Sequence, residues 1–206
     1  MTDKSNATGT AVFPINTELR DGTPVRIRQV QADDKHLLEI GLEHLSKQDR
    51  YFRFFRPVSK LSDKLLSEFT EIDHFNHEAI GALDISEPSG VPIGVARYIR
   101  LPEAETTAEV AVTVANSHQG KGLGTLLLAF VAHRAIENGI EEFAAFVLND
   151  NHRMLAVFKE LEAITKLSAV GEVDIRIPLH RDSACYPQTP VGDVFRQVSA
   201  ILAAEG

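Results

Sequence analysis

The sequence VAVTVANSHQGKGLGTLLLAFVAHRAIEN, residues 110–138, decides the fold. Its first six residues are small, apolar or β-branched, which is typical of a buried strand. A glycine-rich turn follows at residues 119–124, and residues 125–136 then carry apolar side chains at helical spacing. A helix that begins at such a turn directs free N–H groups and the positive end of its dipole outwards. The stretch therefore predicts a pocket for an anion.

Two common phosphate-binding patterns do not fit this turn. A nucleotide-hydrolase phosphate loop needs Ser or Thr after Gly-Lys, whereas Gly120-Lys121 is followed by Gly122. The dinucleotide pattern Gly-x-Gly-x-x-Gly needs its third glycine one residue after Gly124. What remains is Gln-x-x-Gly-x-Gly, beginning at Gln119. The turn alone leaves open the alternative that it binds no ligand.

Composition and charge narrow the class of protein. The 206 residues suffice for one domain with a sizeable core, and the formal net charge of −8 argues against a nucleic-acid-binding protein. Cys185 is the single cysteine, so an intramolecular disulfide is excluded and a reducing compartment is favoured. No apolar run reaches the roughly 20 residues of a membrane span, and residues 1–16 lack the apolar centre of a secretory signal. We therefore expect a cytoplasmic protein that binds neither nucleic acid nor membrane.

The rest of the pattern divides the chain into three regions. Residues 1–16 are polar and small, and we expect them to be disordered. Residues 17–180 are expected to form the domain, beginning with a hairpin around Asp21-Gly22. Strands are expected at 25–30, 79–85, 93–100, 107–115, 143–148 and 172–178, and helices at 34–46, 63–70, 125–136 and 151–161. The order suggests an α/β sheet of mixed direction.

Residues 181–206 form a C-terminal extension with an amphipathic helix. Pro187 and Pro190 interrupt it, and apolar residues then recur at helical spacing from Val191 to Leu202. Such a stripe is expected to be covered. The sequence leaves open whether it docks on its own domain or forms a homo-oligomer.

Two further stretches each have two interpretations. RYFRFFR, residues 50–56, predicts either a helix corner that buries its rings and exposes its arginines, or a wall of the substrate cleft. His74 and His77, flanked by acidic residues, could hold zinc, but a third ligand in a fixed frame is missing. A polar loop without a metal is therefore the expectation for the second stretch.

Several motifs, in this order, resemble the GNAT acyltransferases, and among them the Pat-type bacterial protein lysine acetyltransferases. They are Asp21-Gly22 with Arg26-Ile27-Arg28, Arg50-Tyr51-x-Arg53-Phe54-Phe55, Phe69-Thr70 with Asp73, His77-x-Ala79, Ala108-Glu109-Val110-Ala111, Gln119-Gly120-x-Gly122-Leu123-Gly124-Thr125 and Asn151-x-x-Met154-Leu155. The resemblance covers about residues 17–180. It implies the GNAT fold, an α/β (α+β) architecture whose mixed, mostly antiparallel sheet is flanked by helices. It also implies acetyl-CoA as co-substrate, without a metal.

The resemblance also implies roles for individual residues. The backbone of Val112 and Val114 would lie along the pantetheine and acetyl group, and Asn151 would contact the CoA arm. The amides of residues 119–125 would hold the pyrophosphate, with Lys121 adding charge. The implied cofactor-binding residues are Val112, Val114, Gln119, Gly120, Lys121, Gly122, Leu123, Gly124, Thr125 and Asn151.

Glu109 lies where these enzymes carry their general base, and elementary chemistry supports that role. An amine must be neutral to attack a thioester, and a lysine pKa of about 10.4 makes its neutralisation at pH 7 cost on the order of 4–5 kcal/mol. A carboxylate near the acetyl group can accept that proton directly or through a water. The alternative interpretation of Glu109 is a solvated strand glutamate.

Two departures from the family pattern affect the expected site. Phe158 stands where many GNAT enzymes have a tyrosine that protonates the leaving thiolate, and Glu162-Ala163 replaces the usual glycine at that helix end. The expected activity is acetyl transfer to a protein lysine. Direct attack by the amine in a ternary complex is expected because no nucleophile is placed to form a covalent intermediate: Cys185 lies far in sequence from the glycine turn. The alternatives are a small-amine or amino-acid N-acetyltransferase, or a CoA-binding module with little catalysis.

Overall fold

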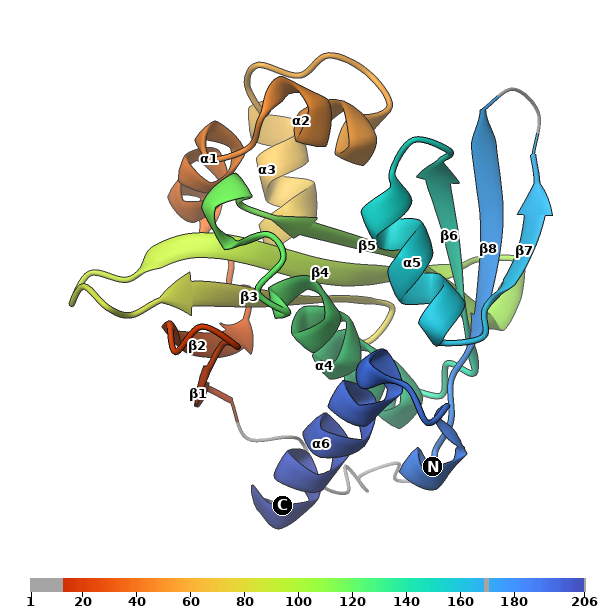
Figure 1. Cartoon of the computed structure of the whole chain (residues 1–206). Helices are drawn as coiled ribbons and strands as arrows, with labels where there is room; N and C mark the ends of the chain where they lie inside the picture. Colours follow the sequence, from red (N-terminus) through yellow and green to blue (C-terminus); the bar gives the residue numbers. More distant parts are fainter. Residues whose placement is uncertain (1–12, 169–170, 206) are drawn as a thin grey trace, which may run out of the picture.

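One mixed β-sheet organises the computed structural model, which describes residues 13–168 and 171–205 (Figure 1). Within these residues the eight strands follow the order β1-β2-β3-β4-β5-β6-β8-β7. They are β1 Ile15–Glu18, β2 Pro24–Gln29, β3 His77–Asp84, β4 Val91–Leu101, β5 Ala104–Val114, β6 Glu142–Leu148, β7 Ile164–Leu167 and β8 Glu172–Pro178. Neighbours are antiparallel except β5 and β6, which are parallel. The expected fold class is confirmed.

The helices cover both faces of this sheet. They are α1 Lys35–Glu43, α2 Lys47–Phe54, α3 Asp63–Thr70, α4 Leu123–Glu137, α5 His152–Glu160 and α6 Pro190–Glu205, with short turns η1 Asn116–His118 and η2 Ser183–Cys185. Figure 1 shows α1–α3 grouped together at the top, with α4 and α5 in front of the sheet and α6 alongside α4. In the described part of the chain, no helix has the length and apolar character that a membrane crossing requires.

The main core lies between α4 and the sheet. Phe130 and Leu127 of α4 and Ile27, Ile80 and Tyr98 of the sheet are each fully buried there. A smaller apolar cluster forms where α1 meets α3, from Leu42, Leu45, Leu61 and Leu66. The sheet therefore separates an extensive α4 side from an α1–α3 side with less apolar contact.

A buried polar network fixes α4 against the sheet. Glu78 of β3 is fully buried, and its carboxylate accepts hydrogen bonds from Arg134 Nε at 3.2 Å and from Gln29 Nε2 at 2.9 Å. His74 Nδ1 lies 2.7 Å from the other carboxylate oxygen. A buried carboxylate needs such partners because its desolvation is expensive. The network therefore orients the helix that follows the glycine turn.

The parallel strands β5 and β6 separate part-way along. Their register runs Thr107↔Glu142, Ala108↔Phe143 and Glu109↔Ala144 and ends there, although β5 continues to Val114 and β6 to Leu148. Figure 1 shows β6 and β8 running in a clearly different direction from β3–β5. A gap therefore opens in the sheet just beyond Glu109.

The C-terminal helix docks on its own chain. Val191, Phe195, Val198 and Leu202 are all buried in the main core, and α6 contacts α4. The apolar stripe that suggested a homo-oligomer is therefore covered within the chain. Pro190, expected to interrupt the extension, is instead the first residue of α6, where a proline lacks only a donor that the helix does not use.

The other expected boundaries differ from the structure in small ways. Most of the expected 1–16 segment lies outside the described residues, but β1 already begins at Ile15. The strand β7 was not predicted. It covers only four residues, ITKL, at the edge of the sheet, and Ile164 is exposed. A strand this short and exposed has no apolar alternation from which to predict it.

Candidate active site

The glycine turn presents a row of free backbone donors. Gly120 and Gly122 have φ values of +78° and +90°, a left-handed region that favours glycine, and Gly122 caps α4 without a side-chain hydrogen bond. Within the described chain, the backbone N–H groups of residues 120–125 donate to no protein acceptor. Consecutive free amides at a helix N-terminus form a ready anion site.

Positive side chains surround this turn. Arg20 lies against Gly122, since a Cβ added there would be 3.2 Å from Arg20 Nε. Arg153 of α5 donates to Gln119 Oε1, and Gln119 Nε2 in turn donates to the Val114 carbonyl at 3.2 Å. The turn is thereby tied both to α5 and to the end of β5.

Lys121 is paired within the protein instead of standing free. Its Nζ lies 2.8 Å from Asp21 Oδ2, and this bond holds the pKa of the Asp21 carboxyl below its usual range. The expected extra charge for a phosphate is therefore shared with Asp21 in this structure. Asn151 is likewise occupied, because its side chain caps α5 by accepting from the Met154 N–H at 3.3 Å.

The backbone of Val112 and Val114 faces the gap between β5 and β6. The Ala115 N–H donates to Ile93 of β4 at 2.8 Å, so alternate residues along β5 direct their N–H and C=O groups away from β4. Val112 and Val114 are such residues, and β6 no longer pairs with them. An elongated ligand could therefore bind along this strand edge as a further strand would.

Glu109 lies where the gap begins, with its exposed side chain on the α1–α3 face of the sheet. Ile99 of β4 is directly opposite, and Ala144 of β6 is directly beside it. Because side chains alternate along a strand, Phe146 lies on the same face as Ala144. Ile99 is 45% exposed and Phe146 is 47% exposed, so the carboxylate has an apolar, open surround.

Two arginines lie on the same side of the sheet as Glu109. The guanidinium carbon of Arg97 is 4.1 Å from the centroid of the Phe69 ring, and that of Arg53 is 5.6 Å from it. Burial lowers the pKa of Arg53, and the negative charge of Glu109 offsets part of that change. The helix-corner interpretation of residues 50–56 holds only in part. Phe54 packs against the small apolar cluster and Arg56 is exposed, as expected, but Tyr51 and Phe55 are exposed and Arg53 turns inward.

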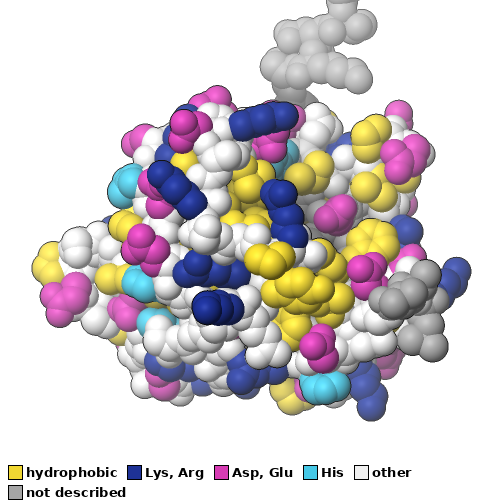
Figure 2. Space-filling model, turned by 90° about the horizontal axis from the view of Figure 1, so that it is seen from above, with side chains coloured by type: hydrophobic (Ala, Val, Ile, Leu, Met, Phe, Trp, Pro, Cys, Tyr) yellow, Lys and Arg dark blue, Asp and Glu magenta, His cyan; other side chains and the backbone are white. Residues whose placement is uncertain are grey.

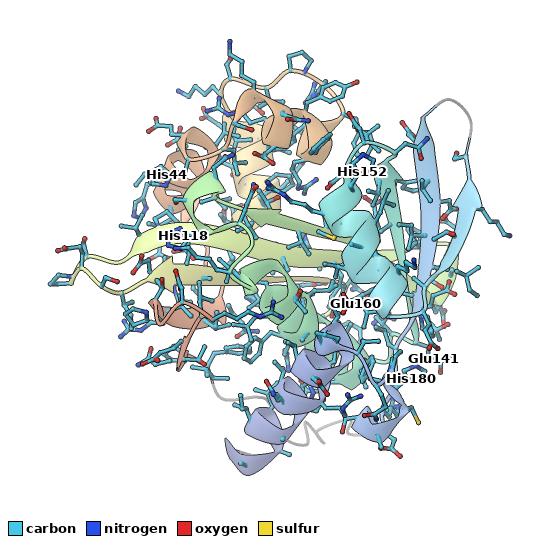
Figure 3. The ribbon with its side chains drawn as sticks, in the orientation of Figure 1. His44, His118, Glu141, His152, Glu160 and His180 are labelled. Carbon is cyan, nitrogen blue, oxygen red and sulfur yellow. The ribbon has the colours of Figure 1, made fainter. Side chains whose placement is uncertain are left out.

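The histidines are spread over separate elements. Figure 3 shows His44 and His118 near each other beside α1 and η1, with His152 on α5 and His180 near the C-terminal region. In the described residues no three His, Cys, Asp or Glu side chains form a group that could hold a metal. His77 instead accepts from Arg97 at 3.2 Å through Nε2, since a guanidinium can only donate.

The two departures noted in the sequence occupy different environments. Phe158 is buried in the main core, so its ring packs the α5 side and offers no donor. Glu162 has a φ of +55°, so a glutamate adopts the left-handed conformation that usually selects glycine after a helix. The left-handed turn after α5 is therefore formed although glutamate stands in place of the usual glycine.

The sequence predicted that the glycine turn follows β5 in one site, but it did not predict that arginines surround them. Arg20 and Arg153 reach the turn from distant parts of the chain, and Arg97 meets Arg53 through sheet packing. No local spacing signals these contacts. Only Arg53 stood within a stretch that the sequence had singled out, as one side of a cleft.

The sequence is similar to known acetyltransferases. The model of the acetyltransferase (GNAT) family matches residues 44–162, more than half of the chain. Over 172 residues the chain is 31% identical to acetyltransferase Pat of Mycolicibacterium smegmatis, covering 80% of this chain and 50% of that protein. Over 124 residues it is 32% identical to acetyltransferase PA5475 of Pseudomonas aeruginosa, covering 60% and 66%. The chain thus spans about half to two thirds of these relatives.

A solved structure agrees with the sequence matches. The GNAT domain of S. lividans PAT superposes with a TM-score of 0.74 at 33% identity, covering 81% of this chain and 97% of that one. The fold that carries the strand–turn–helix unit and the gap between β5 and β6 is therefore similar to that of a solved GNAT domain. The chain belongs to the GNAT family of acetyltransferases, whose members use acetyl-CoA as co-substrate.

Proposed function

We propose that the chain transfers the acetyl group of acetyl-CoA to the side-chain amine of a protein lysine. The observation that carries this proposal is the end of the β5–β6 register at Glu109, with the free amides of residues 120–125 on the helix that follows β5. The pyrophosphate would bind these amides. The pantetheine arm would then lie along Val112 and Val114, with its thioester towards Glu109.

The acetyl-transfer step follows from this placement. Glu109 takes a proton from the acceptor ammonium, directly or through a water, and the neutral amine attacks the thioester carbonyl carbon. The Val114 N–H faces the gap and would stabilise the oxyanion. The nitrogen of the tetrahedral intermediate then loses its second proton to solvent, the carbon–sulfur bond breaks, and CoA leaves as a thiolate. Phe158 cannot protonate that thiolate, so solvent would do so.

The surface around Glu109 favours a protein acceptor. Besides Ile99 and Phe146, Tyr51 of α2 is 45% exposed and Phe55 is 39% exposed. Figure 2, seen from the α1–α3 side, shows apolar side chains gathered beside Lys and Arg side chains. Exposed apolar residues with charged neighbours are typical of protein-binding surfaces. The name Pat of the M. smegmatis relative supports the same acceptor class.

A matched pair of variants tests the proposal. Glu109→Gln should lower kcat/KM for thiol release at least ~100-fold, because the general base is lost, while the Kd for acetyl-CoA stays unchanged. Glu105→Gln, on the same strand and also exposed, should behave as the wild type. Equal rates for Glu109→Gln and wild type would remove Glu109 from its role.

The acceptor is tested by the same assay with lysine peptides, polyamines and free amino acids. Release with lysine peptides supports the proposal, and release only with free amines or amino acids would support the small-molecule alternative. Binding of acetyl-CoA without release on any acceptor would instead favour a CoA-binding module.

The cytoplasmic location stays a prediction, supported by the single cysteine, Cys185.

A further inference from the structure

A cavity of about 100 Å³ lies between α1–α3 and the strands β3–β5. Its wall is mostly apolar and includes Leu37, Leu38, Leu42, Leu45, Phe54 and Phe69. Three arginines also line it: Arg28, Arg53 and Arg97. A cavity of this size with a cationic wall is unusual, because buried charges normally have partners.

Arg28 has a carboxylate of its own. Its two terminal nitrogens donate to Asp34 at 2.6 and 2.7 Å, a bidentate pair, and one of them also donates to the Gln29 carbonyl. This pair raises the pKa of the Arg28 guanidinium and lowers that of Asp34. Arg28 is therefore held by the protein itself, and it shows what a satisfied arginine looks like in this cavity.

Arg97 and Arg53 lack such a carboxylate. Arg97 is 4% exposed, and its Nη1 donates to the Phe69 carbonyl at 3.3 Å and to His77 Nε2 at 3.2 Å. In the described residues no hydrogen bond is formed by Arg97 Nε or Nη2 or by the Arg53 guanidinium, which contacts the rings of Phe54 and Phe69. None of these nitrogens is sealed from solvent, so a ligand can reach them. Two guanidinium groups thus share one aromatic ring and one cavity without an anion in contact.

Two like charges against one ring disfavour each other in this arrangement. Burial lowers the pKa of Arg97 to about 9, and the positive charge of Arg53 contributes to that change. His77 cannot compensate, because burial and the charge of Arg97 lower its pKa to about 4 and keep the ring neutral at pH 7. An anion in contact with both arginines would reverse the repulsion. A planar carboxylate matches the donor geometry of guanidinium groups best.

We propose that Arg53 and Arg97 form a subsite for a carboxylate carried by the amine acceptor. This inference rests on the proposed acetyl transfer and names a feature of its acceptor. Ile99 of β4 pairs with Glu109, and Arg97 lies two residues along β4 from Ile99, so the side chains of Arg97 and Glu109 are diagonal neighbours on the same face of the sheet. An acceptor amine at Glu109 and a carboxylate at the arginines would therefore belong to one small group. The carboxylate would come either from an acidic side chain next to the target lysine or from the carboxylate of a free amino acid.

Paired acceptors test the subsite by kinetics. A lysine peptide with a neighbouring glutamate is compared with the same peptide carrying glutamine, and a free amino acid is compared with its amide. The wild type should have a KM about 10- to 100-fold lower for the carboxylate member of at least one pair. The pair that shows the difference identifies the source, and equal KM values in both pairs would overturn the subsite.

Variants separate binding from folding. Arg53→Gln should abolish the difference within the pair, while the KM for acetyl-CoA stays unchanged and Arg53→Lys restores part of the preference. Arg56→Gln, three residues further and exposed, is the matched control and should keep the difference. A preference that persists in Arg53→Gln would overturn the proposal.

A binding measurement distinguishes this inference from the proposed function. Titration should show that the wild type binds N-acetylglycine and that Arg53→Gln binds it with a 10- to 100-fold higher Kd. The uncharged N-acetylglycinamide should bind to neither protein. Binding of this kind without thiol release on any acceptor would refute the acetyl transfer and keep the subsite. Thiol release with no preference for carboxylate acceptors and no binding of N-acetylglycine would refute the subsite and keep the acetyl transfer.

Discussion

Replacing Gly120 with alanine should weaken acetyl-CoA binding by more than its effect on folding explains. The φ of Gly120 is +78°, and a Cβ added there has no protein atom within 4 Å. The fold therefore loses only the conformational cost of a left-handed alanine, about 1–2 kcal/mol. The new methyl group, however, would occupy the open space in front of the amides of residues 120–125.

Gly139 provides a control with the same conformation. Its φ is +80°, a Cβ added there also meets no protein atom within 4 Å, and it follows the far end of α4. Both variants should lower the Tm by about 2–8 °C, the shift that 1–2 kcal/mol produces in a domain of this size. Only Gly120→Ala should lose a charge-assisted hydrogen bond to the pyrophosphate, which weakens binding by about 10- to 100-fold.

Calorimetric titration with acetyl-CoA and thermal unfolding measure both effects on the same samples. The reasoning is refuted if Gly120→Ala binds acetyl-CoA as tightly as the wild type, or if Gly139→Ala loses the same affinity. Gly124 is not a suitable probe. A Cβ there would lie 3.6 Å from Val114 Cγ2, so it points to the sheet and not to the phosphate side.

Three further predictions concern the scaffold. Arg134→Met should destabilise the fold by about 3–5 kcal/mol in denaturant titration, because it leaves the buried Glu78 carboxylate without its charged partner; a loss under about 1 kcal/mol would contradict a structural role for the pair. Phe195→Ala should cost about 3–5 kcal/mol, since its ring is buried between α6 and the main core; unchanged stability would mean that α6 does not dock as described. For His77, the folded pKa of about 4 lies below the ordinary value of 6.5, so the unfolded chain binds the proton first and stability falls as the pH drops from 6.5 to 4. His77→Gln should reduce that fall by about 1–2 kcal/mol, a figure discounted because the ring is partly exposed, and an identical pH profile would show that His77 does not contribute.

The strand–turn–helix unit could be predicted because its signals are local. The β-branched run before the glycines and the helical spacing after them fix β5 and α4 to within a few residues. The helix expected at residues 63–70 is likewise found as α3, with Ser62 before it, whose side chain accepts from the Leu65 N–H. Backbone preferences and short-range hydrogen bonds are written in adjacent residues.

The environment of Glu109 could not be predicted in this way. Pairing between β5 and β6 ends at Glu109, whereas β6 stays paired with β8 over its whole length, and no residue near Glu109 encodes this difference. The inward turn of Arg53 depends on Phe69, sixteen positions away in the sequence. The aromatic rings nearby suggested the opposite orientation, because apolar side chains are usually the buried ones. Tertiary packing decided both features.

The most direct measurement is calorimetric titration of the full chain with acetyl-CoA, followed in the same cell by thiol release on adding a lysine peptide. The account predicts saturable binding at one site and release of one thiol for each amine acetylated. Binding should persist in Glu109→Gln while thiol release falls at least ~100-fold. The absence of any binding would mean that residues 119–124 form only a turn, and would contradict the acetyl-CoA site and the mechanism built on it.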